Sequence, residues 1–249
     1  MNPFILSFFI PFLAGISTLI GYFPTYIPSY YHDKVIGFSL SFSAGVMVAI
    51  SCLSLIPEAI SYLKGFPSLP SFLLFSIFFL LGILFSFSID QIITKKKETK
   101  LYQIGIVSMI TLILHNLPEG ILSYLTTTKD LKLGISLSFA IAIHNIPEGI
   151  AIAIPIYFST KSRRKSILYT ALSGFSEVLG AILAYFFFKN TINSYLFMTL
   201  LDTTSGVMLM ISFKELIPNS FDYLSLKEFL YSFLGGILLM SLCIFYFHI

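Results

Sequence analysis

The chain has 249 residues, of which 56% are hydrophobic and 11% are charged, and its mean hydropathy is +0.89. Soluble domains carry roughly 25% charged residues, so this composition excludes a soluble enzyme and predicts a polytopic membrane protein. The net charge of +3 is small and its charges gather in short loops, which indicates membrane topology and no nucleic-acid partner. Cys52 and Cys243 lie in apolar stretches and are expected to be small core residues, with no disulfide and no zinc knuckle.

Eight apolar intervals are long enough to cross a bilayer, which takes about 20 helical residues. They predict helices over residues 3–23, 35–60, 70–93, 103–126, 133–158, 165–188, 195–218 and 228–248. The runs are continuously apolar, which favours helices over a barrel, because backbone groups in lipid must be satisfied within each segment. The first run lacks a basic start and a cleavage site, so we expect it to be retained as a span. No loop has the length of a folded domain, and residues 1–249 are expected to form one all-α transmembrane domain.

Lysine and arginine are unevenly shared between the two sides of this predicted bundle. The side reached after the odd-numbered spans holds Lys34, Lys95, Lys96, Lys97, Lys100, Lys161, Arg163, Arg164, Lys165 and Lys227, and the other side holds Lys64, Lys129, Lys132 and Lys189. Because loops rich in Lys and Arg stay in the cytoplasm, the first side should be cytoplasmic. Both chain termini are then expected outside the cell membrane.

Two segments in different spans resemble each other without a gap. Residues 43–58 begin Ser-Ala-Gly-Val-Met and end Leu-Ile-Pro-Glu, and residues 204–219 begin Thr-Ser-Gly-Val-Met and end Leu-Ile-Pro-Asn. Spans 2 and 7, which carry them, cross the membrane in opposite directions. This predicts an inverted repeat, with spans 1–3 and 6–8 around a central pair of spans 4 and 5. The alternative is that Gly and Pro are simply frequent in membrane helices.

A six-residue motif occurs twice in the apolar interior, as His-Asn-Leu-Pro-Glu-Gly at 115–120 and as His-Asn-Ile-Pro-Glu-Gly at 144–149. Ionisable side chains at that depth cost about 2.5 to 3.5 kcal/mol each on insertion scales, so their repetition indicates a function. His and Glu are four residues apart in each copy, about one helical turn, and therefore lie on one face. Imidazole and carboxylate are ligands that suit Zn²⁺ and related divalent metals.

Spans 4 and 5 should form an antiparallel hairpin centred near residue 131, which sets the depth of these four side chains. His115 and Glu148 are equally far from that centre, as are Glu119 and His144. Each histidine is therefore expected to face the glutamate of the other helix. Pro118 and Pro147 cannot donate a backbone hydrogen bond and should kink the helices and free carbonyl oxygens at the motifs.

Three further polar residues are placed to extend this group, and small residues allow close approach. Asn116 and Asn145 lie three residues before the glutamates, near enough to share a second ion. Glu177 in span 6 is a buried acid at a similar depth, and we interpret it as a fifth ligand; the alternative is a protonated structural carboxyl group. Gly120 and Gly149 should let helices or ions approach closely.

At these residues the chain resembles the ZIP family of divalent metal transporters, most closely its bacterial ZupT type, over essentially its whole length. The tandem motifs, the acid in span 6 and the basic segment 159–165 carry the resemblance. It implies a two-metal centre in which Glu119 and Glu148 bridge the ions. One ion would bind His115, Glu119, His144 and Glu148, and the other Asn116, Glu119, Asn145, Glu148 and Glu177.

The resemblance also implies what the protein moves and how. It implies uptake of Zn²⁺ into the cytoplasm, with Fe²⁺, Mn²⁺, Co²⁺ and Cd²⁺ also accepted, no prosthetic group, and a homodimer in the cell membrane. Spans 1, 4, 5 and 6 would move against spans 2, 3, 7 and 8. In the repeat, Ser54 stands opposite Glu215, where family members often carry an acid in span 2, so one transit ligand is expected to be missing.

Two other interpretations of the motifs stay open, and so does a second interpretation of the acids Glu58 and Asp202. A membrane-embedded metal-dependent hydrolase is disfavoured because the spacing lacks the His-Glu-x-x-His arrangement. The His and Glu pairs would alternatively be buried structural ion pairs. Glu58 and Asp202, near the outer ends of spans 2 and 7, are interpreted as solvated interfacial carboxylates, with an entrance that gathers cations as the alternative.

Overall fold

The computed structural model describes residues 3–27, 32–63, 68–94, 99–188 and 194–247, and all regular structure within them is helical. Eight helical segments in this described part are long and apolar enough to cross a membrane, as predicted. These are Phe4–Tyr26, Asp33–Ser61, Pro70–Ile92, Lys100–Lys129, Leu131–Thr160, Arg163–Phe187, Tyr195–Ser220 and Leu226–Tyr246. Of the basic residues used for orientation, Lys64, Lys95, Lys96, Lys97 and Lys189 lie outside the described residues. The side on which the termini lie stays a prediction.

Several spans are built from more than one kind of helix. The elements in chain order are α1 (Pro3–Ser17), the 3₁₀ helix η1 (Thr18–Tyr26), α2 (His32–Ile50), the π-helix η3 (Ser51–Leu55), α3 (Ile56–Ser61), α4 (Ser68–Thr94), α5 (Lys100–Lys129), α6 (Leu131–Thr160), α7 (Arg163–Leu183), the π-helix η4 (Ala184–Phe188), α8 (Ser194–Ile211), the π-helix η5 (Ser212–Leu216), α9 (Ile217–Ser220) and α10 (Leu226–Phe247).

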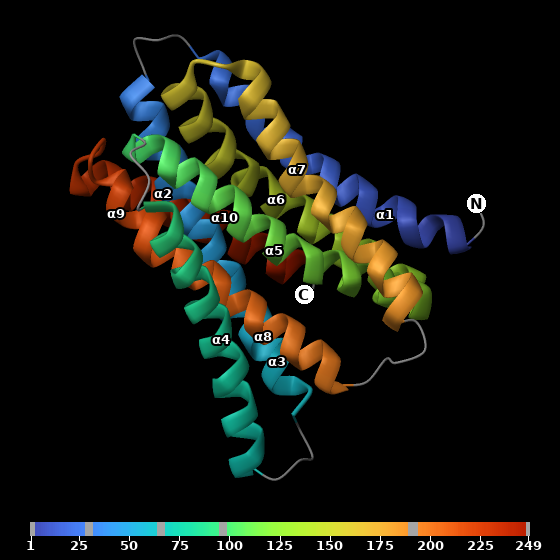
Figure 1. Cartoon of the computed structure of the whole chain (residues 1–249). Coiled ribbons are helices and arrows are strands. Elements are labelled where there is room, and N and C mark those ends of the chain that lie inside the picture. The colour runs from blue at the N-terminus through green and yellow to red at the C-terminus, as the bar shows by residue number, and fades with distance from the viewer. Residues whose placement is uncertain (1–2, 28–31, 64–67, 95–98, 189–193, 248–249) are drawn as a thin grey trace.

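The helices pack in two sets that meet along the middle of the molecule. In Figure 1, α1 and α7 run beside α5 and α6, and α4 runs beside α8. Glycines allow backbones to touch inside each set: Gly15 meets Gly174 between α1 and α7, Gly45 meets Phe233 between α2 and α10, and Gly82 meets Thr203 between α4 and α8. Such small residues let helices approach closely where lipid gives no hydrophobic drive to associate.

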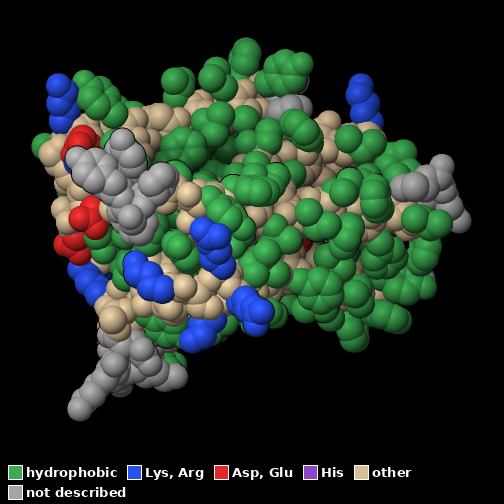
Figure 2. Space-filling model, turned by 90° about the horizontal axis from the view of Figure 1, so that it is seen from above, with side chains coloured by type: hydrophobic (Ala, Val, Ile, Leu, Met, Phe, Trp, Pro, Cys, Tyr) green, Lys and Arg blue, Asp and Glu red, His purple; other side chains and the backbone are tan. Residues whose placement is uncertain are grey.

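The outer surface suits a bilayer. Only 11% of the span in α4 and 17% of that in α10 is buried, and both expose Leu and Phe side chains. Figure 2 shows hydrophobic side chains over most of one face, with most of the visible Lys and Arg in one half. Cys52 belongs to this exposed surface and Cys243 is half-buried, so the prediction that both are core residues is wrong. A small apolar side chain serves equally well against lipid.

The first span is an α-helix only as far as Ser17 and continues as the 3₁₀ helix η1. Gly21 of η1 lies against the backbone of Gly149 and Ile150 in α6, and Gly149 in turn lies under the carbonyl of Thr18. A 3₁₀ helix is narrower than an α-helix, which suits this close crossing. Hydropathy carries no signal of the change, because an apolar run is compatible with either helix type.

The two segments predicted as a repeat share a local distortion. Each widens into a π-helix at aligned positions, η3 in the first segment and η5 in the second, before Pro57 and Pro218 respectively. A proline ring clashes with the carbonyl four residues earlier, and the wider turn relieves this clash. The shared widening supports a common origin of the segments, while the inverted topology of the two halves stays a prediction.

Candidate metal centre

The centre is built on the α5–α6 hairpin, whose register is fixed by short-range contacts near its tip. The Asp130 side chain starts α6 by accepting a hydrogen bond from the Leu133 backbone N–H at 3.0 Å. Deeper in the hairpin, the buried hydroxyls of Ser123 and Ser138 bond to each other at 2.6 Å. Gly134 provides the space for Thr127 at the crossing. These contacts hold the two motifs at the same depth.

Each histidine faces the glutamate of the other helix, as the hairpin geometry predicts. His115 Nε2 lies 3.0 Å from Glu148 Oε1, and His144 Nε2 lies 3.0 Å from Glu119 Oε1. His115 Nε2 is also 3.4 Å from Glu119 Oε1, one turn along α5. No more than 3% of any of the four residues is exposed. The structure therefore brings two imidazoles and two carboxylates together in the protein interior.

Several oxygens around this group are buried and have no hydrogen-bond partner among the described residues. Glu148 Oε1 faces His115, and the others are Asn116 Oδ1, Glu119 Oε2, Asn145 Oδ1, Glu148 Oε2 and Glu177 Oε1. An unsatisfied buried polar atom costs about 1–3 kcal/mol, so five of them in one place would be unfavourable without a partner. A cation offers that partner to all of them, because each is an acceptor. One ligand atom each from His115, His144 and Glu148 already lies within 4.8 Å of the others.

The two asparagines are held by their amide nitrogens, which leaves their oxygens available. Asn145 Nδ2 donates to Glu177 Oε2 at 2.9 Å and to the Ala14 carbonyl at 3.0 Å. Asn116 Nδ2 donates to the carbonyl and the hydroxyl of Ser173 at 3.3 and 3.4 Å. Ser173 lies one turn before Glu177 in α7. The structure thus joins Glu177 directly to one asparagine and holds the other beside the same stretch of α7.

The motif glycines bring neighbouring backbones against the centre. Gly120 lies directly against the carbonyl of Glu177, and Gly180 lies against the carbonyl of Leu117. Gly149 makes the equivalent contact with Thr18 of η1. The prediction that Gly120 and Gly149 permit close approach of helices is confirmed. The backbone at Glu177 is therefore fixed to α5 at the motif.

Partners that sequence reasoning missed come from the backbone and from small polar residues. The Ala14 carbonyl and Ser173 orient the asparagines, and Ser43 of α2 donates to the Pro147 carbonyl at 2.6 Å. A backbone carbonyl has no signature in a sequence. Serine is common in membrane helices, so only the position of Ser173, one turn before the acid, offered a signal.

The two outer acids differ from expectation in different ways. Asp202 is 0% exposed, so its interpretation as a solvated interfacial carboxylate is wrong. Its side chain is enclosed by the packed interior of the protein. Glu58 is half-buried and lines a cavity that also reaches Glu119 and His144.

Two charged residues of the second repeat segment have partners close by. Glu215, which aligns with Ser54 in the repeat, lies 3.5 Å from the amide nitrogen of Asn219. Lys214 bonds to Asp90.

Known proteins resemble this chain over most of its length. The family model described as ZIP Zinc transporter matches residues 95–243, which include α5, α6 and α7. The chain belongs to the ZIP family. It is 33% identical to the zinc transporter ZupT of Streptococcus mutans over 94% of this chain and 95% of the relative. It is 34% identical to ZupT of Chlorobium luteolum (90% and 91%) and 32% identical to ZupT of Oceanobacillus iheyensis (97% and 97%).

Membership of the ZIP family narrows the interpretations left open by the sequence. ZIP proteins are transporters, so the chain is a multi-pass membrane transporter and not an enzyme. The alternative of a membrane-embedded hydrolase is therefore wrong. The matched relatives are aligned over nearly their full lengths, so the likeness includes the spans that flank the hairpin.

Proposed function

We propose that this ZIP protein carries Zn²⁺ across the cell membrane into the cytoplasm through an intramembrane centre on α5, α6 and α7. The observation that carries the proposal is the buried cross-helix set of His115, Glu119, His144 and Glu148, with 3.0 Å His–Glu distances. Nitrogen and carboxylate ligands are those that Zn²⁺ prefers. The matched relatives, named zinc transporters, support zinc as the cargo.

The proposed centre holds two ions. One ion binds His115, Glu119, His144 and Glu148, and the other binds Asn116, Glu119, Asn145, Glu148 and Glu177. The unpartnered oxygens of Asn116, Asn145 and Glu177 support the second position. Glu119 and Glu148 would bridge the two ions. Each has two carboxylate oxygens, and only one oxygen of each carboxylate lies against a histidine. Two cations sharing ligands repel each other, which assists release.

Transport requires that the cation exchange its water for protein ligands and later leave them. The cage of His, Asn and Glu replaces the hydration shell, and binding must remain weak enough for departure. We propose that α1, α5, α6 and α7 move as one set against α2, α4, α8 and α10. The glycine contacts lie within these sets and support them: they join α1, α5, α6 and α7 in the first set, and α2 with α10 and α4 with α8 in the second. Such movement exposes a central site to one side at a time.

Further parts of the proposal concern cargo range and assembly. The same ligand types accept Fe²⁺, Mn²⁺, Co²⁺ and Cd²⁺, since imidazole and carboxylate bind many divalent metals. We also propose one transporter domain over residues 1–249, both termini outside the cell, and a homodimer in the membrane.

The test is metal accumulation by vesicles that contain the purified protein. Zn²⁺ uptake is measured alone and in competition with Fe²⁺, Mn²⁺ and Mg²⁺. The Glu148→Ala variant should abolish uptake while the protein stays folded in detergent. A merely structural ion pair predicts unfolding of this variant instead. Uptake by the Glu148→Ala variant equal to that of the unmodified protein would overturn the proposal.

A further inference from the structure

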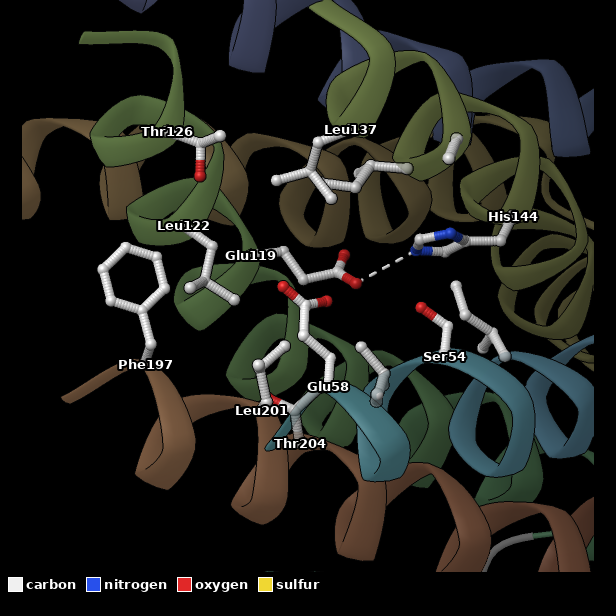
Figure 3. A pocket seen from close by; sticks show the side chains of 14 residues that line it. Ser54, Glu58, Glu119, Leu122, Thr126, Leu137, His144, Phe197, Leu201 and Thr204 are labelled. Carbon is white, nitrogen blue, oxygen red and sulfur yellow. Dashed lines mark hydrogen bonds and ion pairs between the residues drawn. The ribbon is translucent and has the colours of Figure 1, made fainter. Parts of the chain in front are cut away.

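A small cavity adjoins the metal centre on the side of α2 and α8. It has a volume of about 40 Å³, and it reaches from Glu58 of α3 to Glu119 and His144 of the centre. In Figure 3 the carboxylate of Glu58 points toward that of Glu119, and the Ser54 hydroxyl points toward His144. The π-helix η3 ends just before α3 and sets the positions of Ser54 and Glu58 one turn apart.

The polar atoms of this cavity are arranged for a positively charged occupant. Thr204 Oγ1 and Glu119 Oε2 are buried and have no hydrogen-bond partner among the described residues. Thr204 is 2% exposed and Glu119 is 3% exposed. The lining residues include the two carboxyl groups of Glu58 and Glu119 and the imidazole of His144, and no Lys or Arg is among them. The remaining wall is mostly apolar, with side chains that include Ile50, Leu122, Ile141 and Phe197.

Electrostatics favours a cation between the two glutamates. Like charges that face one low-dielectric space repel, and a divalent cation turns that repulsion into attraction. A single water needs about 10–15 Å³ of such volume, so the cavity holds only a few waters and not a complete hydration shell. An ion in this space must already have replaced part of its water with oxygens of the protein.

We propose that Glu58 is the capture ligand of the transporter, which binds the divalent cation before the ion passes to Glu119 and His144. Ser54 and Thr204 supply hydroxyl oxygens at the same position, and hydroxyl and carboxylate oxygens suit a cation that still carries water. The capture site rests on the proposed transport function and adds the route by which the cargo reaches the centre. In the sequence repeat, Ser54 of the first segment aligns with the acid Glu215 of the second. Glu58 would supply the first segment with a carboxylate ligand in place of the one missing at Ser54.

The test compares initial rates of Zn²⁺ uptake by vesicles over a range of Zn²⁺ concentrations. Glu58→Gln keeps the size of the side chain and removes its charge. Its KM for Zn²⁺ should rise about tenfold, the lower end of the range by which charged clefts raise encounter rates, with little change in maximal rate. Thr204→Val should raise KM in the same direction by less. Equilibrium Zn²⁺ binding to the centre of Glu58→Gln should remain at the stoichiometry of the unmodified protein.

Asp222→Asn is the matched control, since it removes the same charge from an exposed ion pair with Lys100 outside the cavity. Its KM should equal that of the unmodified protein. If Glu58→Gln does not fold, Glu58→Asp, which keeps the charge on a shorter side chain, should give a smaller rise in KM. An unchanged KM for Glu58→Gln beside an inactive Glu148→Ala overturns the capture site and leaves the transport function standing. Zn²⁺ uptake that survives Glu148→Ala contradicts transport through the proposed centre.

Discussion

Gly120 of α5 lies directly against the backbone carbonyl of Glu177 on α7, so that a Cβ atom at residue 120 would overlap the carbonyl oxygen. Gly120→Ala must therefore separate the two helices at the centre. Overpacking of this kind costs typically about 1–3 kcal/mol. We expect a lower thermal unfolding temperature in detergent and loss of zinc uptake by vesicles, because Glu177 moves away from the motifs.

Gly235 provides the control for this substitution. It lies inside α10, and apart from the surrounding turns of α10 no heavy atom of the described residues lies within 4 Å of a Cβ placed there. Gly235→Ala should stabilise the protein by about 0.5–1 kcal/mol, because Gly is unfavourable in a helix interior. The two glycine substitutions should thus change the unfolding temperature in opposite directions. A Gly120→Ala protein as stable and active as Gly235→Ala would show that α5 and α7 need no close contact.

Zn²⁺ should stabilise the folded protein by binding to the buried centre. A ligand that binds only the native state stabilises it by about 2.7 kcal/mol at a concentration one hundred times its Kd. We expect the unfolding temperature to rise with Zn²⁺ and to return on chelation. Mg²⁺ prefers all-oxygen octahedral sites and holds its water firmly, so its effect should be much smaller.

His144→Ala should remove most of the zinc-dependent rise, because it deletes one imidazole beside Glu119. Glu228→Gln is the control: Glu228 pairs with Lys34 at 2.5 Å near the start of α10 and takes no part in the centre. Its zinc-dependent rise should match that of the unmodified protein. Equal rises in His144→Ala and Glu228→Gln would mean that zinc binds elsewhere.

Glu177→Gln should remove one of the two proposed ions and leave the other bound. Glu177 belongs only to the set that includes the asparagines, and its Oε2 already accepts a hydrogen bond from Asn145. The neutral amide keeps the volume of the side chain but removes the charge that the second cation needs. Zinc measured after equilibrium dialysis should fall from two ions per chain to one, with uptake slowed. Two ions retained by the variant would remove Glu177 from the ligand set.

The sequence was sufficient to predict the cross-helix pairing of His115 with Glu148 and of Glu119 with His144. In an antiparallel hairpin, residues equally far from the tip lie at the same depth. In a helix, residues four apart lie on the same face, so the positions of these four side chains relative to one another are largely determined. The eight spans follow from hydropathy for a similar reason, since lipid requires each segment to satisfy its own backbone.

Other features depend on contacts between segments that are remote in sequence. The burial of Asp202 could not be predicted, because membrane depth says nothing about which face of α8 a residue occupies. The bond from Asn145 to the Ala14 carbonyl involves an atom that every residue possesses. The π-helices η3 and η5 are set by Pro57 and Pro218 acting at a distance of several residues, and the same prolines are compatible with a simple kink.

Ser43 links the two sets of helices close to the metal centre, and its removal tests their relative movement. Its hydroxyl donates to the carbonyl of Pro147, the residue before Glu148, at 2.6 Å. If α6 moves away from α2 during transport, this buried bond must break in each cycle. Ser43→Ala should lower the free energy of unfolding by about 1 kcal/mol, the net value of a typical hydrogen bond. Because the same bond opposes the movement, the maximal rate of zinc uptake should rise.

Ser41→Ala controls for the loss of a hydroxyl from the same helix. Ser41 donates within α2, to the carbonyl of Phe38 at 3.3 Å, and makes no bond to the described residues of the other set. Its maximal uptake rate should equal that of the unmodified protein in parallel assays on the same vesicle preparation. If Ser43→Ala is less stable but transports at that same rate, the bond to Pro147 survives the cycle. In that case α2 and α6 stay together, and the boundary between the moving sets must lie elsewhere in the bundle.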